Sequence, residues 1–170
     1  MVFARGLCNT KTKLYDKARG NIMILLRNFK NEDTSKLQKY GYSDLTAEQV
    51  EALICDWYEK QFNGKYFEMY AIVSDEKIVG TISLYQHSSE VISIGPEIFC
   101  EYRRKGFAKE AMICACQMAK EKGFKIVSQQ IRTNNAASIA LHCSLGFETN
   151  ELVFTNAKGN QVYIYLKCLT

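Results

Sequence analysis

The sequence predicts an α/β (α+β) fold: one mixed domain with a mainly antiparallel central sheet flanked by helices. Segments with strand character and segments with helical periodicity follow one another with only short turns between them. Neighbouring strand segments are joined as hairpins, which favours antiparallel pairing. The sequence of 170 residues contains no repeat and no Pro/Gly/Ser-rich linker, so we expect a single folded domain that is long enough to bury a core.

The first strand is predicted at Met23 to Arg27, where apolar residues precede an arginine. Residues 1–22 are polar, basic and weakly patterned, unlike the strongly patterned remainder of the chain. We therefore expect an N-terminal extension over residues 1–22 and the folded domain over residues 23–170. The sequence leaves the role of the extension open. A flexible tail, an added segment that lies on the surface, and a start codon assigned upstream of the true one all fit the pattern.

Two helices are predicted after the first strand. The first begins near Asn31, where Asp33 and Thr34 can cap it, and it ends at Gly41. The second begins at Thr46-Ala47-Glu48-Gln49, which has the spacing of a capping box, and it continues with apolar residues at helical spacing. Each helix has an apolar face, as helices that flank a sheet require.

Three strands are predicted next. Tyr66 to Ser74 and Lys77 to His87 are rich in apolar, aromatic and β-branched residues, and Asp75-Glu76 joins them in a hairpin. Val91 to Phe99 is the third strand, and it contains Pro96, the only proline of the chain. Because proline cannot donate to a sheet ladder, this strand must be bulged or pulled away from one neighbour.

The remainder of the chain returns to alternating helices and strands. The predicted elements are a helix over 108–122, a strand over 125–132, a helix over 136–145, and a closing hairpin of strands over 151–156 and 161–169. Gly123 and Gly146 follow the two helices at the positions where glycine commonly ends a helix. These elements complete a sheet that is flanked by helices.

A basic turn, Arg103-Arg104-Lys105-Gly106-Phe107-Ala108, precedes the helix over 108–122. A turn that opens a helix points backbone N–H groups outward, and the helix dipole adds partial positive charge, so the turn attracts phosphate oxygens. Gly106 lacks the Cβ that would keep a ligand away from the backbone. No Gly-Lys-Ser/Thr follows, which excludes a P-loop, and the three-glycine spacing of a dinucleotide site is absent.

Composition excludes several functions. The net charge of +4 is mild and dispersed, which suits an anionic ligand but not nucleic acid. The seven cysteines form no C-x-x-C pair and the chain has two histidines, so metal-site spacing is absent. The apolar run from Ile22 to Leu26 is too short for a signal peptide or a membrane span. We therefore expect a cytoplasmic protein that binds no metal and no membrane.

Two motifs together resemble the GCN5-related N-acetyltransferase (GNAT) superfamily. The first is the basic turn, which matches the family pattern Gln/Arg-x-x-Gly-x-Gly/Ala between a strand and a helix. The second runs from Asn135 to Phe147 and has Ser138, His142 and Gly146 at the spacing of the family's next strand and helix. The resemblance covers roughly residues 23–169. It implies the GNAT fold, in which a mainly antiparallel sheet contains one splayed pair of strands.

The resemblance implies acetyl-coenzyme A as the cosubstrate and no metal. In the family, backbone amides of the turn hold the pyrophosphate, and the strand before the turn pairs with the pantetheine arm. Residues at the start of the second motif also contact the cofactor. The implied cofactor-binding residues are Ile98, Phe99, Cys100, Arg103, Arg104, Lys105, Gly106, Phe107, Ala108, Asn135 and Ser138.

Acyl transfer from a thioester to an amine needs groups that take a proton from the amine and give one to the thiolate. The family usually gives the second task to a tyrosine, and His142 stands at that position here, so His142 is the candidate acid. Gln130 stands where one branch of the family has a glutamate base, and it cannot accept a proton at neutral pH. Glu97 is the best remaining carboxylate and the candidate base, with His87 and Tyr85 as alternatives; loss of the proton through a chain of waters, or binding of the amine in its neutral form, also stays open.

The resemblance thus predicts an acetyl-CoA-dependent N-acetyltransferase that passes an acetyl group directly to a primary amine of a small molecule or a protein N-terminus. An acyl-CoA-binding regulatory module without catalysis is the alternative, favoured by the missing glutamate and the change from tyrosine to histidine. Acidic residues before the hairpin, Glu68 among them, could attract a cation, but most are expected to be solvated. The acceptor amine and the oligomeric state, including a homodimer, stay open.

Overall fold

The computed structural model describes residues 23–170, so the extension predicted over residues 1–22 lies outside the described part. The strands are β1 (Leu25–Arg27), β2 (Gln61–Phe62), β3 (Lys65–Ser74), β4 (Lys77–Gln86), β5 (Val91–Ile98), β6 (Ile126–Arg132), β7 (Phe154–Thr155) and β8 (Gln161–Cys168). The helices are α1 (Thr34–Tyr40), α2 (Ala47–Tyr58), α3 (Phe107–Glu121) and α4 (Ala136–Ser144), with short 3₁₀ turns at Asn31–Asp33 and Cys100–Tyr102.

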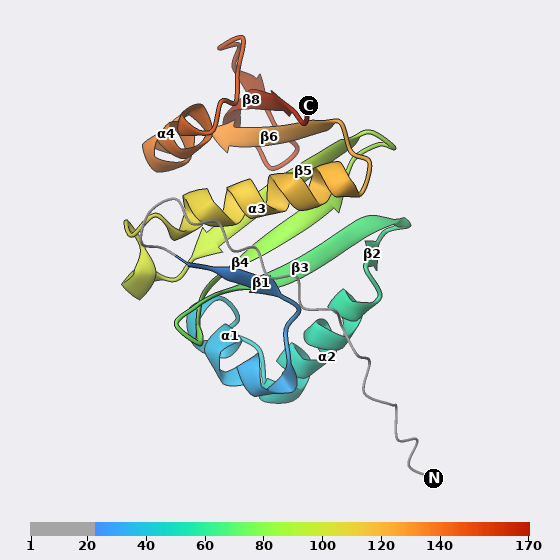
Figure 1. Cartoon of the computed structure of the whole chain (residues 1–170), viewed down its shortest axis with the longest axis vertical. Coiled ribbons are helices and arrows are strands. Elements are labelled where there is room, and N and C mark those ends of the chain that lie inside the picture. Colours follow the sequence, from blue (N-terminus) through green and yellow to red (C-terminus); the bar gives the residue numbers. More distant parts are fainter. Residues whose placement is uncertain (1–22) are drawn as a thin grey trace.

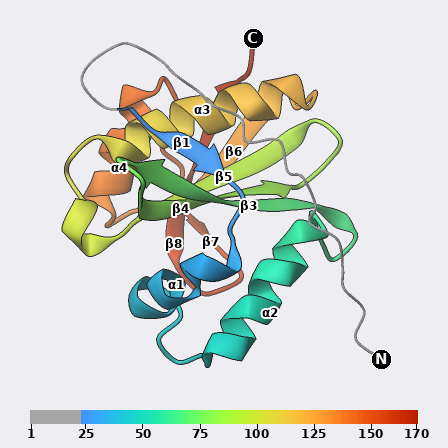
Figure 2. The ribbon, with the colours of Figure 1, turned by 60° about the horizontal axis from the view of Figure 1, so that its bottom comes forward.

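The described strands form one twisted sheet in the order β1-β3-β4-β5-β6-β8-β7, and β2 pairs with β3 (Figure 1). The β5–β6 pair is parallel, and the other ladders are antiparallel. In Figure 2, α3 lies above the sheet and α1 and α2 lie below it. The predicted mixed α/β fold with a mainly antiparallel sheet is therefore confirmed.

Each face of the sheet has its own hydrophobic core because side chains alternate between the two faces of a strand. On one face, α3 packs Ala111, Met112 and Met118 against strand residues such as Ile82 and Ile94. On the other face, the core is built by α1, α2 and neighbouring strands; its buried members include Phe29, Leu37, Val50, Ile54, Trp57, Ala71 and Phe99. The sheet therefore separates two packed layers of helices.

Local signals in the sequence explain where several elements begin. The Thr46 hydroxyl accepts a hydrogen bond from the Gln49 N–H, and the Gln49 side chain accepts one from the Thr46 N–H. This is the predicted capping box of α2. The short strand β2 was not predicted, because its two residues pair with β3 through the Asn63-Gly64 turn and carry no strand periodicity of their own.

The strands β5 and β6 part after a short paired stretch. Only Val91 and Ile92 of β5 pair with β6. Beyond them, the Gln129 side chain on β6 donates a hydrogen bond of 2.5 Å to the Ile94 carbonyl. Backbone groups two residues apart face the same side of a strand, so Pro96 also faces the gap. The missing N–H of Pro96 therefore leaves no broken ladder bond, and the predicted parting of this strand from a neighbour is confirmed.

The other side of β5 is packed tightly against β4. Residues from Gly80 to Gln86 pair without interruption with residues from Ile92 to Ile98. A Cβ placed on Gly80 would lie 2.2 Å from the Glu97 carbonyl oxygen, so only glycine allows the two backbones to approach this closely. The close approach fixes the end of β5, which carries the candidate base, against the rigid centre of the sheet.

Most of the acidic residues before the hairpin were expected to be solvated, but Glu68 is buried. It lies on β3 with 1% of its side chain exposed, 3.0 Å from the Lys60 ammonium and 3.4 Å from that of Lys122. The Tyr66 hydroxyl donates a hydrogen bond to the same carboxylate. Because a buried charge needs partners, the carboxylate ties β3 to the ends of α2 and α3.

Burial acts to raise the pKa of Glu68, but its hydrogen bonds and the nearby ammonium charges outweigh burial. The hydrogen bonds come from Tyr66, Tyr70 and Lys60, and Lys122 adds a favourable charge. Together they hold the pKa of Glu68 at about 2, below its ordinary value of 4.5. The carboxylate is therefore ionised at neutral pH although it lies inside the protein.

Candidate active site

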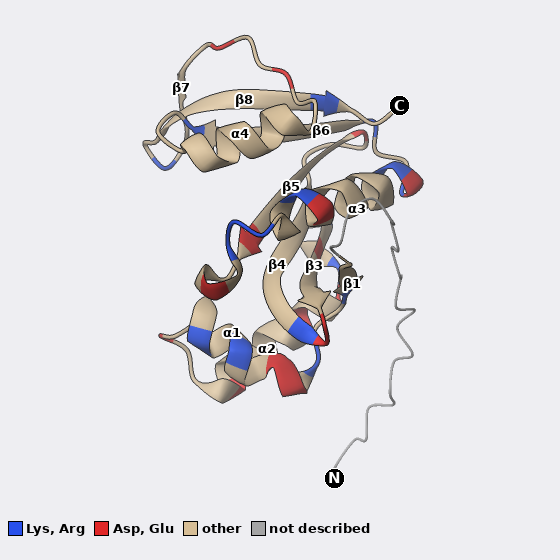
Figure 3. Cartoon of the chain, turned by 60° about the vertical axis from the view of Figure 1, so that its left-hand side comes forward, with Lys and Arg blue, Asp and Glu red and all other residues tan. Residues whose placement is uncertain are grey.

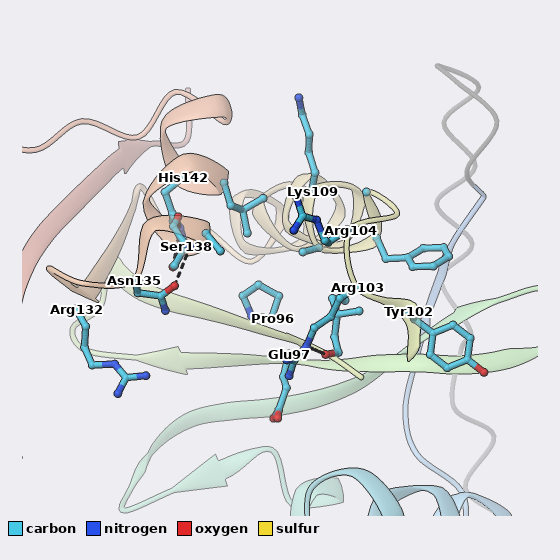
Figure 4. A pocket seen from close by; sticks show the side chains of 16 residues that line it. Pro96, Glu97, Tyr102, Arg103, Arg104, Lys109, Arg132, Asn135, Ser138 and His142 are labelled. Atoms are coloured by element: carbon cyan, nitrogen blue, oxygen red, sulfur yellow. Dashed lines mark hydrogen bonds between the residues drawn. The ribbon is translucent and has the colours of Figure 1, made fainter. Parts of the chain in front are cut away.

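A pocket of about 680 Å³ lies where β5 and β6 part, between the turn that opens α3 and the first turns of α4 (Figure 4). Its wall combines backbone and side chains from both halves of the chain. The lining residues are Pro96, Glu97, Ile98, Tyr102, Arg103, Arg104, Gly106, Phe107, Ala108, Lys109, Arg132, Asn135, Ala137, Ser138, Leu141 and His142. The pocket therefore brings the two sequence motifs together.

The basic turn presents backbone donors to this pocket. Arg104 and Gly106 have left-handed backbone angles, φ 60° and φ 84°, which turn the chain sharply before α3. The consecutive N–H groups from Arg104 to Ala108 have no hydrogen-bond partner among the described residues. In Figure 3 the turn that leads into α3 is coloured blue for Lys and Arg. Free N–H groups, fixed positive charge and the dipole of α3 together form a site for an anion.

The opposite wall of the pocket begins at Asn135. Its side-chain oxygen accepts a hydrogen bond of 3.1 Å from the Ser138 N–H, so Asn135 caps α4. The cap uses the side-chain oxygen of Asn135, so the side-chain NH₂ group stays available to donate a hydrogen bond to a ligand. The same cap fixes the first turn of α4, which places Ser138 in the pocket wall. Asn135 thus combines a structural role with a donor for a ligand.

His142 is 4% exposed and lies one helical turn after Ser138. Its Nδ1 is 2.8 Å from the Ser138 carbonyl oxygen, which can only accept, so Nδ1 carries a proton. The Nε2 atom is buried and has no hydrogen-bond partner among the described residues. Burial lowers the pKa of His142, although the bond to Ser138 opposes this shift. The ring is therefore mainly neutral at pH 7, with an unpaired acceptor at Nε2.

Glu97 and Arg132 project from the parted strands below the pocket (Figure 4). Both side chains are exposed, and neither forms an ion pair with another described residue. The Arg103 Nε atom donates a hydrogen bond of 2.9 Å to the Ile98 carbonyl, which anchors the basic turn to the end of β5. Glu97 and Arg132 are thus a carboxylate and a guanidinium that have no ion-pair partner among the described residues.

The structure brings most of the predicted site residues together. The candidate acid and base, His142 and Glu97, both line the pocket. The predicted cofactor-binding residues that line it are Ile98, Arg103, Arg104, Gly106, Phe107, Ala108, Asn135 and Ser138. Phe99, Cys100 and Lys105 do not line it. Phe99 is a core residue whose ring stacks on Tyr40 at 4.4 Å, and its N–H donates to Val79.

Sequence reasoning missed several residues of the pocket wall, above all Arg132, Lys109 and Tyr102. Arg132 ends β6 three residues before Asn135, so its closeness to the second motif was the available signal. The alternative bases Tyr85 and His87 do not line this pocket. Their rings contact each other at 5.3 Å near the far end of β4. Glu97 is therefore the carboxylate of the pocket wall.

Two other kinds of site are absent from the described residues. No group of three or more His, Cys, Asp or Glu side chains in this part of the chain is arranged to hold a metal ion. No helix within residues 23–170 is both long enough and apolar enough to cross a membrane.

The family is shown by a comparison with known proteins. The model of the GNAT acetyltransferase domain matches residues 24–148, which include the basic turn, both parted strands and α4. The chain therefore belongs to the GNAT acetyltransferase family, as its two motifs predicted.

The chain is also similar to individual proteins, in sequence to the first described here and in fold to the other two. The chain is 31% identical over 107 residues to the SPbeta prophage-derived uncharacterized N-acetyltransferase YokL of Bacillus subtilis (strain 168); the match covers 59% of this chain and 60% of that protein. The fold is similar to that of RimL, a ribosomal L7/L12 alpha-N-protein acetyltransferase solved in complex with coenzyme A, with TM-score 0.73, 14% identity and coverage of 85% and 93%. It is also similar to the microcin C7 self-immunity acetyltransferase MccE, solved with acetyl-CoA and AMP, with TM-score 0.68, 20% identity and coverage of 85% and 92%.

Proposed function

We propose that this protein transfers an acetyl group from acetyl-CoA to a primary amine. The observation that carries the proposal is the run of unpartnered N–H groups from Arg104 to Ala108, which opens α3 and faces a pocket. Such donors at a helix N-terminus suit a pyrophosphate. Membership of the GNAT family and the acetyl-CoA and CoA complexes of MccE and RimL support the same cofactor.

The parted strands fit the rest of the cofactor. On the side of β5 that faces the gap, the Pro96 carbonyl and the Ile98 N–H lack a neighbouring strand, because β6 pairs only with Val91 and Ile92. The amides of a pantetheine arm can pair with such groups as an added strand would. Asn135 and Ser138 border the same gap from α4. Acetyl-CoA bound in this way would supply its thioester at the parting of the strands.

In the proposed reaction the amine nitrogen attacks the thioester carbonyl, a C–N bond forms and the C–S bond breaks. A neutral amine loses one proton and the departing thiolate gains one, so the transfer is balanced; an ammonium acceptor loses one further proton, which passes to solvent. Glu97 is the proposed acceptor of the amine proton. His142 is the proposed donor to the thiolate, and because Nδ1 already donates to Ser138, only the imidazolium can donate from Nε2.

The test is release of free CoA over a panel of small amines and peptides, with wild-type protein and a His142→Phe variant. Turnover by the wild type supports acetyl transfer, whereas acetyl-CoA binding without CoA release for any acceptor contradicts it. The phenylalanine retains the ring that packs against Phe147 and Tyr165, at 4.8 and 6.4 Å in the wild type. We expect turnover to fall roughly 100-fold, the usual order for loss of a general acid.

The pH dependence separates acid catalysis from packing. Because the pKa of His142 is lowered, the imidazolium is populated below the ordinary value of 6.5 and is lost as the pH rises. The ratio of wild-type to His142→Phe turnover should therefore be larger at pH 5.5 than at pH 8. His87→Phe is the matched control, since His87 does not line the pocket. A ratio that is constant with pH would exclude His142 as the acid.

A further inference from the structure

The register of the parted strands relates Glu97 to Arg132. Val91 pairs with Ile126, and Glu97 and Arg132 each lie six residues beyond this pair (97 − 91 and 132 − 126). If the parallel ladder continued, these two residues would be direct neighbours. Because the ladder ends at Ile92 and Val127, they instead lie on the two strands that border the gap. Opposite charges thus stand on the two edges of the opening between β5 and β6.

Both side chains lie on the face of the sheet away from α3 and α4. On β6, Val127 and Ile131 are buried in the core beneath these helices, so the alternation of the strand turns Arg132 to the other face. Figure 4 shows Arg132 and Glu97 below the strands, while Lys109, Ser138 and His142 lie above them. The two charged side chains and the anion site of the basic turn therefore lie on opposite faces of the sheet, and the opening between β5 and β6 connects the two faces.

The surroundings leave both charges available to a ligand. Arg132 and Glu97 make no hydrogen bond or ion pair through their side chains with any other described residue. Arg103, the nearest basic residue in sequence to Glu97, uses its Nε atom for the Ile98 carbonyl. Burial, and then the charge of Glu97, raises the pKa of Tyr42. Tyr42 packs against the core on this same face of the sheet.

We infer that the acceptor of the proposed acetyl transfer is a free amino acid, with its ammonium group at Glu97 and its carboxylate at Arg132. A guanidinium binds a carboxylate through two parallel N–H donors, and a carboxylate attracts an ammonium, so the charges of the two edges complement a zwitterion. The amine would then lie at the opening, beside the base proposed for the reaction. A peptide N-terminus lacks the adjacent carboxylate and would leave Arg132 unpaired. The inference rests on the proposed function.

The experiment compares each free amino acid with its amide and with the amine that lacks the carboxyl group. For the best acceptor, kcat/KM of the wild type should be about 10- to 100-fold higher for the acid than for the amide, as expected for a charge-assisted hydrogen-bond pair. Arg132→Gln should bring this ratio close to 1, mainly by raising KM for the acid. Arg132→Lys should retain part of the ratio because it keeps the charge.

The control variant is Lys158→Gln, which removes the same charge from an exposed turn outside the pocket and should keep the wild-type ratio. Amides or peptides that are acetylated as fast as the free acids would overturn the inference while leaving acetyl transfer intact. Retention of the full ratio in Arg132→Gln would overturn it as well. Failure to release CoA with every acceptor would overturn the proposed function itself, and the inference with it.

Discussion

Replacing Gly106 with glutamate is expected to abolish acetyl-CoA binding and to leave a folded protein. Gly106 stands at φ 84° among the free N–H groups at the start of α3. A side chain there occupies the approach to the backbone, and its carboxylate repels the phosphates that the N–H groups attract. We expect at least a roughly 100-fold loss of affinity by titration calorimetry, since charge-assisted hydrogen bonds to the pyrophosphate are lost together.

Two control variants separate the charge from the backbone effect. Gly106→Ala imposes the left-handed strain without the carboxylate, which costs roughly 1–2 kcal/mol of stability and should weaken binding far less than glutamate does. Gly159→Glu makes the same substitution at φ 76° in the turn before β8, outside the pocket, and should bind like the wild type. Unchanged affinity in Gly106→Glu would show that the phosphates bind elsewhere.

Replacing Glu68 with alanine should lower the free energy of unfolding by about 3 kcal/mol, the usual cost of breaking a buried ion pair from one side. The change leaves the Tyr66 hydroxyl and the Lys122 ammonium without their carboxylate partner. Urea unfolding at pH 7 measures the effect. Glu90→Ala is the control, because the Glu90–Lys125 pair is exposed and should contribute less than about 1 kcal/mol. Equal losses in both variants would exclude a special role for the buried carboxylate.

The acid stability of the protein provides a second measurement on Glu68. Its folded-state pKa of about 2 lies below the ordinary value of 4.5, so its stabilisation is complete above pH 4.5 and is lost as the pH falls toward 2. Glu68→Gln removes this titration while nearly preserving the volume of the side chain. The stability of the wild type should therefore fall more steeply than that of Glu68→Gln between pH 4.5 and pH 2.

The elements of this fold could be predicted because their signals are local. The capping box at Thr46 and Gln49, the turn at Asp75-Glu76 and the glycine after α3 each involve residues close in sequence. The parting of β5 was predictable from Pro96 for the same reason. The basic turn and the second motif were likewise continuous segments, so most of their predicted residues line the candidate pocket, whereas Tyr102, Lys109 and Arg132 of its wall were not predicted.

The remaining features depend on residues that are distant in sequence. Glutamate is usually found on the surface, and the partner Lys122 follows α3, far from Glu68 in the sequence. The residues next to Glu68 in the sequence therefore do not predict that it is buried and paired. Arg132 and Glu97 are related only by the register of β5 and β6, which the sequence does not show. In the neutral ring of His142, Nε2 carries no proton because Nδ1 donates its hydrogen bond to the Ser138 carbonyl. The spacing of the two residues on the helix does not by itself predict this hydrogen bond.

The two walls of the pocket come from distant parts of the chain, and this affects how the protein folds during synthesis. The basic turn is complete by Ala108, but the opposite wall requires Asn135 to His142, and β8 must still pair with β6 to hold that wall. A chain that emerges from the ribosome N-terminus first cannot close the pocket until its last strand is available. Cofactor affinity then measures how completely the chain has folded, and bound cofactor would protect finished molecules in preference to truncated ones.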